Sequence, residues 1–287
     1  MGEVMINNKV AILILLLVVP LLCGCVSQDE VPSGKMRVAA TIAPLGEFVE
    51  IVGGDKVVIT VIVPPGAEPH TFEPTPSQMS DVAKADLYVM NGAGLEFWMN
   101  KVLEVNKKMA IVDSSKGVAL LQESGGEMDP HIWISLRNAG LQVNNICSGL
   151  VQVDPTNKDY YTKNRDNYLQ KLQSLDEELS RSFVSTKSKI FIVHHPAWAY
   201  FARDYGLKEV PLMENEKEPG PKYLGEVVDL AKKNNIITIF VEPEYNPKAA
   251  EVIAREMNAS IISLDPLGKN YLENMARAGR EIAKSLA

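Results

Sequence analysis

Four histidines are the residues of this chain whose placement points to metal chemistry. Each lies close to prolines in a loop-like segment, outside any regular periodic pattern: His70, His131, His194 and His195. Neutral imidazole is a preferred ligand of Zn²⁺ and also suits other transition-metal ions. A single histidine is more often a hydrogen-bonding residue of the surface or core. The joint pattern favours a shared site, although spacing alone leaves coincidence open.

Short apolar runs alternate with helix-like stretches in both halves of the chain. The runs are rich in Val and Ile and are continuous, which is typical of parallel strands covered by helices on both faces. Four runs come first and four more follow residue 188, so we predict two similar α/β lobes. The runs cover residues 37–42, 57–63, 85–90, 109–113, 190–194, 207–213, 236–242 and 260–265.

The segment between the two sets of runs predicts one long helix. It opens with Asp154 as an N-cap and Pro155 at the first helical position, and it contains no glycine. About 30 helical residues would extend roughly 45 Å, enough to follow both lobes and to limit their closure. Large side chains recur at helical spacing and predict one buried stripe: Tyr161, Tyr168, Leu172, Leu175, Leu179 and Phe183.

The loops that carry the histidines are expected at the carboxyl ends of the strands. Ligands of open α/β sheets bind in the crevice beyond these ends, so two facing lobes would bring the loops to one cleft. The first lobe offers His70 and His131, and the second offers His195 and, after its last run, Asp265. Three imidazoles and one carboxylate suit Zn²⁺ and can also bind Mn²⁺.

Other acidic residues near the histidines have two readings each. Glu68 could reach the metal or be solvated, and Asp129 could orient an imidazole by accepting its second N–H. Glu242 ends a predicted strand and Glu244 follows it, and we expect both to cap the next helix and interact with its dipole.

The N-terminus has the pattern of an export signal. Lys9 precedes an apolar run over 10–22 that is too short to be a comfortable permanent membrane span. The run ends in the sequence LCGC, which matches the lipobox cut before a lipidated cysteine. We therefore predict a signal peptide over 1–24, lipidation of Cys25 and a polar tether over 25–35. An uncleaved anchor helix is the alternative. Both predictions place the rest of the chain outside the cytoplasm, at the outer face of the cytoplasmic membrane.

Composition excludes some partners and some chemistry. The formal net charge is −7, which argues against nucleic acid because phosphate binding requires a basic surface. Cys147 is the one cysteine beyond the predicted signal and lipidation site, so the mature chain has no pair for a disulfide. We expect a buried, inert thiol there.

Five segments resemble the cluster A-I metal-binding lipoproteins, the zinc and manganese receptors of bacterial and archaeal ABC importers. They are GAEPHTFEPTPSQ, MDPHIWIS, VHHPAWAYFARDYGL, IFVEPEYNPKAAEVIA and LDPLG, in an order that runs from about residue 36 to the C-terminus. The resemblance implies two lobes, each with a four-stranded parallel sheet flanked by helices, joined by one long backbone helix. The corresponding boundaries are an N-terminal lobe over 36–153, a linking helix over 154–187 and a C-terminal lobe over 188–287.

The resemblance also implies the metal ligands. His70 is the first, His131 the second and His195 the third, with His194 as a neighbour. Asp265 takes the fourth position or lies just beyond the ligands, since some zinc receptors use three histidines with a water or a glutamate. A third histidine, where manganese receptors have a glutamate, favours zinc over manganese. The loop before His131 lacks the histidines that many zinc receptors carry there.

The implied function is capture and delivery without catalysis. The protein would bind zinc, or next manganese, between its lobes as a monomer and pass it to the permease and ATPase of an ABC importer. Affinity should fall below about pH 6.5, because imidazole must be neutral to bind metal. A zinc hydrolase is the first alternative, but the chain has no HExxH helix and no Ser/His/Asp arrangement. An adhesin-type lipoprotein with a structural metal is the second.

Overall fold

The computed structural model describes residues 34–123, 125–213 and 220–287. The predicted signal peptide, Cys25 and nearly all of the tether lie outside the described residues. Within the described ranges, no helix is both long enough and apolar enough to cross a bilayer.

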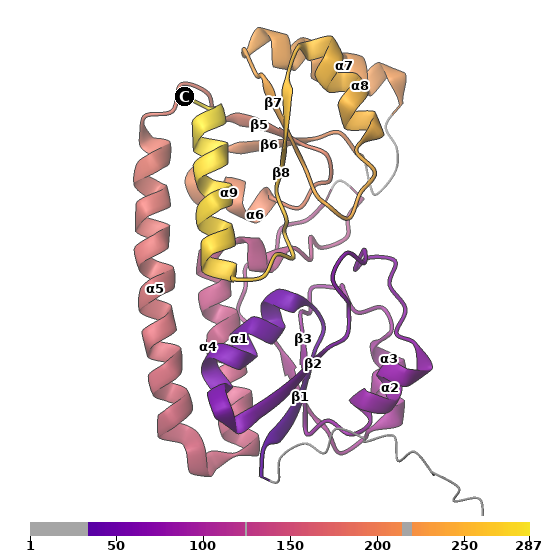
Figure 1. The fold of residues 1–287 in the computed structure, drawn as a ribbon, viewed down its shortest axis with the longest axis vertical. Helices are drawn as coiled ribbons and strands as arrows, with labels where there is room; N and C mark the ends of the chain where they lie inside the picture. The colour runs from indigo at the N-terminus through magenta and orange to yellow at the C-terminus, as the bar shows by residue number, and fades with distance from the viewer. Residues whose placement is uncertain (1–33, 124, 214–219) are drawn as a thin grey trace, which may run out of the picture. The chain divides into compact units, whose positions relative to one another are not determined.

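The N-terminal lobe is a parallel four-stranded sheet in the order β2-β1-β3-β4 (Figure 1). Its central strands are almost completely buried, as their continuous apolar sequence predicts. The strands are β1 (Met36–Ala40), β2 (Val57–Val61), β3 (Leu87–Met90) and β4 (Ala110–Asp113), and the connecting helices are α1 (Ala43–Gly53), α2 (Pro76–Val82) and α3 (Met99–Val105).

The C-terminal lobe repeats this topology, with a parallel sheet in the order β6-β5-β7-β8. Its strands are β5 (Ile190–Val193), β6 (Lys208–Pro211), β7 (Thr238–Val241) and β8 (Ser260–Ser263). Its helices are α6 (Ala199–Tyr205), α7 (Pro221–Lys233), α8 (Lys248–Met257) and α9 (Tyr271–Ser285). The eight predicted strands and the two α/β lobes are therefore confirmed.

Two long helices link the two sheets along the chain, α4 (Leu136–Val153), which packs on the N-terminal sheet, and α5 (Lys158–Val184), which runs alongside both lobes (Figure 1). The 27 residues of α5 extend about 40 Å and confirm the predicted long helix. Its start differs from the expectation, because Asp154 ends α4 and Pro155 begins a 3-10 turn over Pro155–Asn157. The carboxylate of Asp154 accepts hydrogen bonds from Thr156, Asn157 and Tyr161, which stabilise this turn between the helices.

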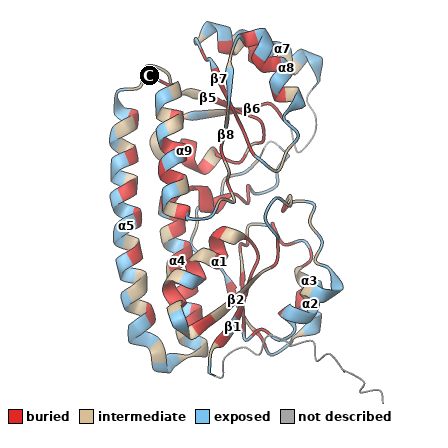
Figure 2. Ribbon diagram, viewed as in Figure 1, coloured by how far each residue is buried: buried red, intermediate tan, exposed pale blue. Residues whose placement is uncertain are grey.

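The predicted stripe of α5 is buried along its whole length. Figure 2 shows the buried face directed toward α4 and α9 and the opposite face exposed. One hydrophobic cluster combines this stripe with side chains of both lobes, such as Phe48 and Phe240. A second cluster lies in the C-terminal lobe, where Ile192 and Ile239 of its sheet pack with α7 and α8. The two lobes therefore share a core along α5.

Buried hydrogen bonds also join the lobes beside the predicted site. The Tyr271 hydroxyl of α9 donates to the Trp133 carbonyl at 2.6 Å, and the Trp133 indole donates to the Pro266 carbonyl at 2.8 Å. The Tyr200 hydroxyl of α6 donates to the Asp129 carbonyl at 2.7 Å. Because buried polar groups are costly to leave unpaired, these bonds hold the segment around His131 against the C-terminal lobe.

Candidate metal site

Three loops from the two lobes place three histidines together. His70 lies in the connection from β2 to α2, and His195 comes two residues after β5. His131 immediately precedes the 3-10 turn Ile132–Ile134, and residues 114–130 separate it from β4 in the sequence. His131 thus lies in the segment that follows the carboxyl end of β4, as expected, although many residues separate it from the strand.

The imidazole nitrogens lie at distances that suit one metal ion. Nε2 of His131 is 3.0 Å from Nε2 of His70 and 3.2 Å from Nε2 of His195. One ligand nitrogen from each ring lies within 4.8 Å of the other two. Zn–N bonds of about 2.05 Å at tetrahedral angles separate two nitrogens by about 3.3 Å. A slight outward movement of the rings would therefore fit a zinc ion between them.

Asp129 orients the central imidazole. Its Oδ1 accepts from Nδ1 of His131 at 2.8 Å and from the His131 backbone N–H at 2.9 Å, and both side chains are buried. A proton on Nδ1 leaves the lone pair on Nε2, which faces the other two histidines. The contact that the sequence suggested for Asp129 is present in the structure.

The backbone N–H groups of the other two histidines each donate a hydrogen bond to a carboxylate, and an aromatic ring stacks on His195. Oε1 of Glu68 accepts from the His70 N–H at 2.9 Å, and Oε2 of Glu242 accepts from the His195 N–H at 3.2 Å. The Tyr245 ring stacks on the His195 ring, with centroids 4.7 Å apart and planes inclined by 21°. Sequence reasoning missed Tyr245, since nothing in the order of residues indicates which ring stacks on which.

The two glutamates after β7 do not cap the next helix, contrary to the expectation from the sequence. Glu242 does not cap the next helix, because it is 1% exposed and its carboxylate contacts the His195 backbone. The N-cap position of α8 is Pro247, without a side-chain cap. Glu244 lines the cavity beside the histidines and is also not the cap of α8.

Burial favours the neutral forms of the titratable groups in the site. It lowers the pKa of His70 from 6.5 to about 3, with the nearby His131 as the second cause. Burial also lowers the pKa of His195, followed by the effect of its histidine neighbours. The pKa of Glu244 is raised to about 7, mainly by burial, with Asp265 and Glu68 as smaller causes. The imidazoles of His70 and His195 are therefore neutral at physiological pH, the form that binds metal.

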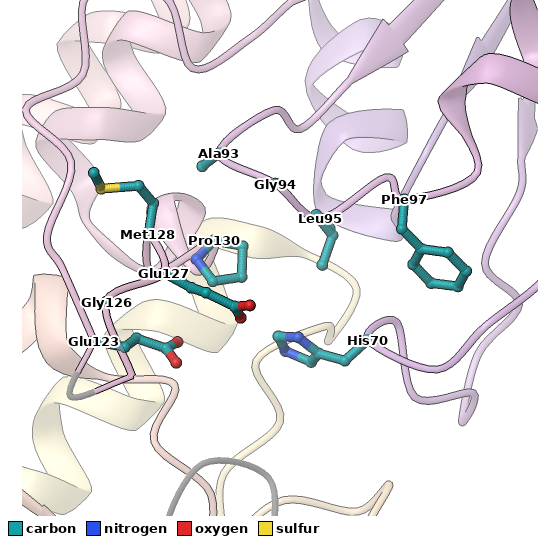
Figure 3. Close-up of a pocket in the computed structure, with 10 residues that line it drawn as sticks. All are labelled: His70, Ala93, Gly94, Leu95, Phe97, Glu123, Gly126, Glu127, Met128 and Pro130. Carbon is teal, nitrogen blue, oxygen red and sulfur yellow. The ribbon is translucent and has the colours of Figure 1, made fainter.

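The histidines enclose a small cavity beside a larger open pocket. The cavity of about 20 Å³ holds one water-sized species, and its walls include Trp133, Pro266 and Leu267. The neighbouring pocket of about 800 Å³ reaches the other side of His70. Figure 3 shows the carboxylates of Glu123 and Glu127 directed toward His70 across this pocket. An approach lined with negative charge favours cations.

The remaining predicted residues lie outside the cluster of nitrogens. His194 is buried, and its ring packs edge-on against Tyr245 at 5.7 Å between centroids. Asp265 follows β8 as expected, but its Oδ1 accepts from the Leu267 N–H at 2.8 Å, and its carboxylate is not in the group of atoms within 4.8 Å. Metal binding by Asp265 stays a prediction. Cys147 is buried, as expected.

The fold and the cluster together define a class of protein. Two parallel α/β lobes joined by a long helix, with three imidazoles converging from both lobes, are the features of a two-lobed metal-binding receptor. The family of the zinc-uptake complex component A, periplasmic (ZnuA), matches residues 38–285. The chain belongs to this family.

Individual relatives agree with this assignment. The high-affinity zinc uptake system protein ZnuA of Bacillus subtilis (strain 168) is 34% identical over 254 residues, which cover 81% of this chain and 79% of the relative. The manganese ABC transporter substrate-binding lipoprotein PsaA of Streptococcus pneumoniae is 28% identical over 291 residues, 96% of this chain and 92% of the relative. Relatives therefore include both zinc and manganese proteins.

Solved structures show the same fold. A crystal structure of ZnuA superposes with a TM-score of 0.86 at 36% identity, covering 88% of this chain and all of that chain (100%). The laminin-binding protein Lmb of Streptococcus agalactiae, described as bifunctional with adhesin and metal-transporting activity, gives a TM-score of 0.83 at 32% identity, with 88% and 100% coverage.

Proposed function

We propose that this protein is an extracytoplasmic lipoprotein that captures a zinc ion between its lobes and delivers it to an ABC importer. The observation that carries the proposal is the convergence of one ring nitrogen each from His70, His131 and His195 within 4.8 Å. His70 and His131 come from the N-terminal lobe and His195 from the C-terminal lobe. The metal ion is the cargo, and both lobes contribute to holding it.

The donor set favours zinc, with manganese as the second cargo. Three neutral nitrogens match the preference of Zn²⁺, whereas Mn²⁺ favours sites richer in oxygen. Two relatives described as zinc proteins, the ZnuA of Bacillus subtilis and the AdcA of Streptococcus pneumoniae, support the assignment. The manganese protein PsaA among the relatives supports manganese as the second cargo.

The membrane and importer roles rest on the sequence and on the family. Export and lipidation of Cys25 would hold the protein at the outer face of the cytoplasmic membrane as a monomer. A permease with its ATPase would then receive the metal. The proposed lobes over 36–153 and 188–287 and the linking helix over 154–187 are the parts of the mature protein that carry out this task.

Capture without catalysis fits the site better than hydrolysis does. A catalytic zinc site needs an open coordination position next to room for a substrate. The cavity that all three imidazoles line has about 20 Å³, enough for an ion but not for an organic substrate. The neighbouring pocket of about 800 Å³ is lined by His70 but by neither His131 nor His195. We therefore propose that the chain is not an enzyme.

Competitive titration tests the proposed cargo and ligands together. The full-length chain is stripped of metal with a chelator and titrated with Zn²⁺ and Mn²⁺ against a chromophoric chelator. We expect one tightly bound Zn²⁺ per chain, weaker binding of Mn²⁺, and loss of tight binding in a variant carrying His70→Ala, His131→Ala and His195→Ala. Stoichiometric tight binding of zinc by this triple variant would refute the site.

A further inference from the structure

A group of buried polar side chains lies inside the N-terminal lobe, at the carboxyl ends of β3 and β4. The group consists of Asn91, Glu96, Ser114 and Gln142, and each residue is at most 6% exposed. Asn91 follows β3 directly, and Ser114 follows β4 directly. None of the four lines the cavity of the three histidines. Burial of polar side chains is costly unless they form hydrogen bonds, so the bonds of this group indicate what it holds in place.

The side chain of Asn91 connects this group to the metal site. Its Nδ2 donates to the Pro130 carbonyl at 2.8 Å. The same carbonyl accepts from the Ile132 N–H at 2.8 Å, which forms the tight turn around His131. The Pro130 carbonyl and the His131 N–H belong to one planar peptide unit, and the N–H donates to Oδ1 of Asp129 at 2.9 Å. The peptide that carries the ligand is therefore held at both of its polar ends.

Asn91 is itself held at each of its polar atoms. Its backbone N–H donates to Oε1 of Glu96 at 2.6 Å, and its backbone carbonyl accepts from the Ser114 hydroxyl at 3.1 Å. Nε2 of Gln142 donates to Oδ1 of Asn91 at 3.4 Å and to Oγ of Ser114 at 3.0 Å. Because Gln142 donates to Oδ1, the amide has its N–H₂ group directed at Pro130. These bonds connect α4 and the ends of β3 and β4, so they give the amide a single orientation.

The carboxylate of Glu96 closes the turn that follows Asn91. Its Oε2 accepts from the Gly92 N–H at 3.1 Å, in addition to the bond that Oε1 accepts from the Asn91 N–H. Ala93 in this turn has a φ of 54°, in the left-handed region that a residue with a Cβ rarely adopts. Strain of this kind persists only where the surrounding structure enforces it. Glu96 thus stabilises the one backbone conformation that places Asn91 beside Pro130.

We propose that Asn91 is a positioning residue of the metal site, whose amide fixes the Pro130–His131 peptide and thereby the direction of the His131 imidazole. This inference rests on the proposed function of the three-histidine site. Nε2 of His131 lies 3.0 Å from that of His70 and 3.2 Å from that of His195, so a shift of the His131 backbone changes both distances. A site that is rigid before the ion enters avoids the loss of conformational entropy that ordering a loose segment would require.

Zinc affinity of two matched asparagine variants tests the proposal. Asn91→Ser removes the donor to Pro130 and keeps a small polar side chain. The control is Asn106→Ser, because Nδ2 of Asn106 donates to the Ala83 carbonyl at 3.1 Å and to the Ala85 carbonyl at 2.9 Å. Asn106 belongs to the same lobe but precedes β4, at the edge of the sheet opposite to the histidines.

The full-length chains are stripped of metal and titrated with Zn²⁺ against a chromophoric chelator. Groups that orient a metal ligand contribute about 10- to 100-fold in affinity, so we expect a loss of about 10-fold or more for Asn91→Ser. We expect less than about threefold for Asn106→Ser, which does not contact the segment of His131. If Asn91→Ser does not fold, Asn91→Asp takes its place, since it keeps the size of the side chain and replaces the N–H₂ donor by an acceptor.

Two spectroscopic measurements separate positioning from a general loss of stability. The proton on Nδ1 of His131, which is hydrogen-bonded to Asp129, should give a downfield proton resonance in the metal-free protein. Its chemical shift should change in the Asn91 variant and stay unchanged in Asn106→Ser. With Co²⁺ as a probe of ligand geometry, the visible d–d bands should likewise change only in the Asn91 variant.

The outcomes distinguish this inference from the proposed function. If the triple histidine variant loses tight zinc binding and the Asn91 variant matches wild type, the positioning role is wrong and the function stands. Equal losses of affinity in the Asn91 and Asn106 variants also overturn the positioning role, because they would reflect stability alone. If the triple variant binds as wild type does, the proposed function itself fails.

Discussion

Oδ1 of Asp129 accepts a hydrogen bond from Nδ1 of His131 at 2.8 Å, inside a part of the site where both residues are about 3% exposed. The same oxygen accepts the backbone N–H of His131 at 2.9 Å. The carboxylate thus controls both the tautomer and the position of the histidine that lies between the other two.

This contact predicts that Asp129→Asn weakens zinc binding without changing its stoichiometry. Partners of this kind contribute about 10- to 100-fold in metal affinity, since they orient the ring and raise its basicity. Competitive titration measures the effect, with Asp81→Asn on the exposed face of α2 as the control. An Asp129→Asn protein with wild-type affinity would show that the contact has no role in binding.

The neutral imidazoles predict that the metal-free protein loses stability in acid. The pKa of His70 falls from 6.5 to about 3 on folding, so its contribution is complete above pH 6.5 and is lost as pH falls toward 3. The loss of stability from His70 between pH 7 and pH 5 is about 2 kcal/mol. Between pH 7 and pH 5, the free energy of unfolding measured in urea should therefore decrease less in His70→Gln than in wild type. Equal drops in both proteins would contradict the burial effect.

The same shift changes the expectation for metal release. An unperturbed imidazole would begin to compete with protons near pH 6.5, but the lowered pKa values of His70 and His195 move that competition to more acidic solution. Zinc retention measured by dialysis at stepwise lower pH should persist below pH 6. Release of half the metal above pH 6.5 is the result that would count against this reading.

The packing of α9 on α5 predicts opposite effects for two glycine substitutions. A Cβ on Gly279 would lie 2.5 Å from Cδ2 of the buried Leu179, whereas a Cβ on Gly225 in α7 would meet nothing within 4 Å. We expect Gly279→Ala to destabilise the protein by about 1–3 kcal/mol and Gly225→Ala to stabilise it by about 0.5–1 kcal/mol. Chemical denaturation measures both, and a stabilising Gly279→Ala would mean that α9 sits further from α5.

The hydrogen bond between the lobes predicts a cost for removing one hydroxyl. Tyr271→Phe leaves the buried Trp133 carbonyl without its 2.6 Å donor, which should cost about 1–3 kcal/mol of unfolding free energy. Tyr160→Phe, on the exposed side of α5, should change stability by less than about 0.5 kcal/mol. Equal changes in unfolding free energy in the two variants would show that the Tyr271 hydroxyl does not stabilise the contact between the lobes.

The strands and the buried face of the long helix were predictable from the sequence, because each follows a pattern that repeats over neighbouring residues. The continuous apolar runs predicted all eight strands, and the spacing from Tyr161 to Phe183 predicted the buried face of α5. Both patterns express a repeat of the backbone itself, so neighbouring residues carry the information. The start of α5 was less predictable, because Asp154 and Pro155 suit a helix start and a tight turn equally well.

Features that join distant segments were decided by the tertiary structure. Sequence pattern placed four histidines and several carboxylates near one cleft, but the contacts within it depend on how long loops fold back. His131 lies far beyond the end of β4 along the chain, and the Tyr245 ring contacts residue 195 from the turn after β7. Only the packing of the lobes along α5 brings His70, His131 and His195 together.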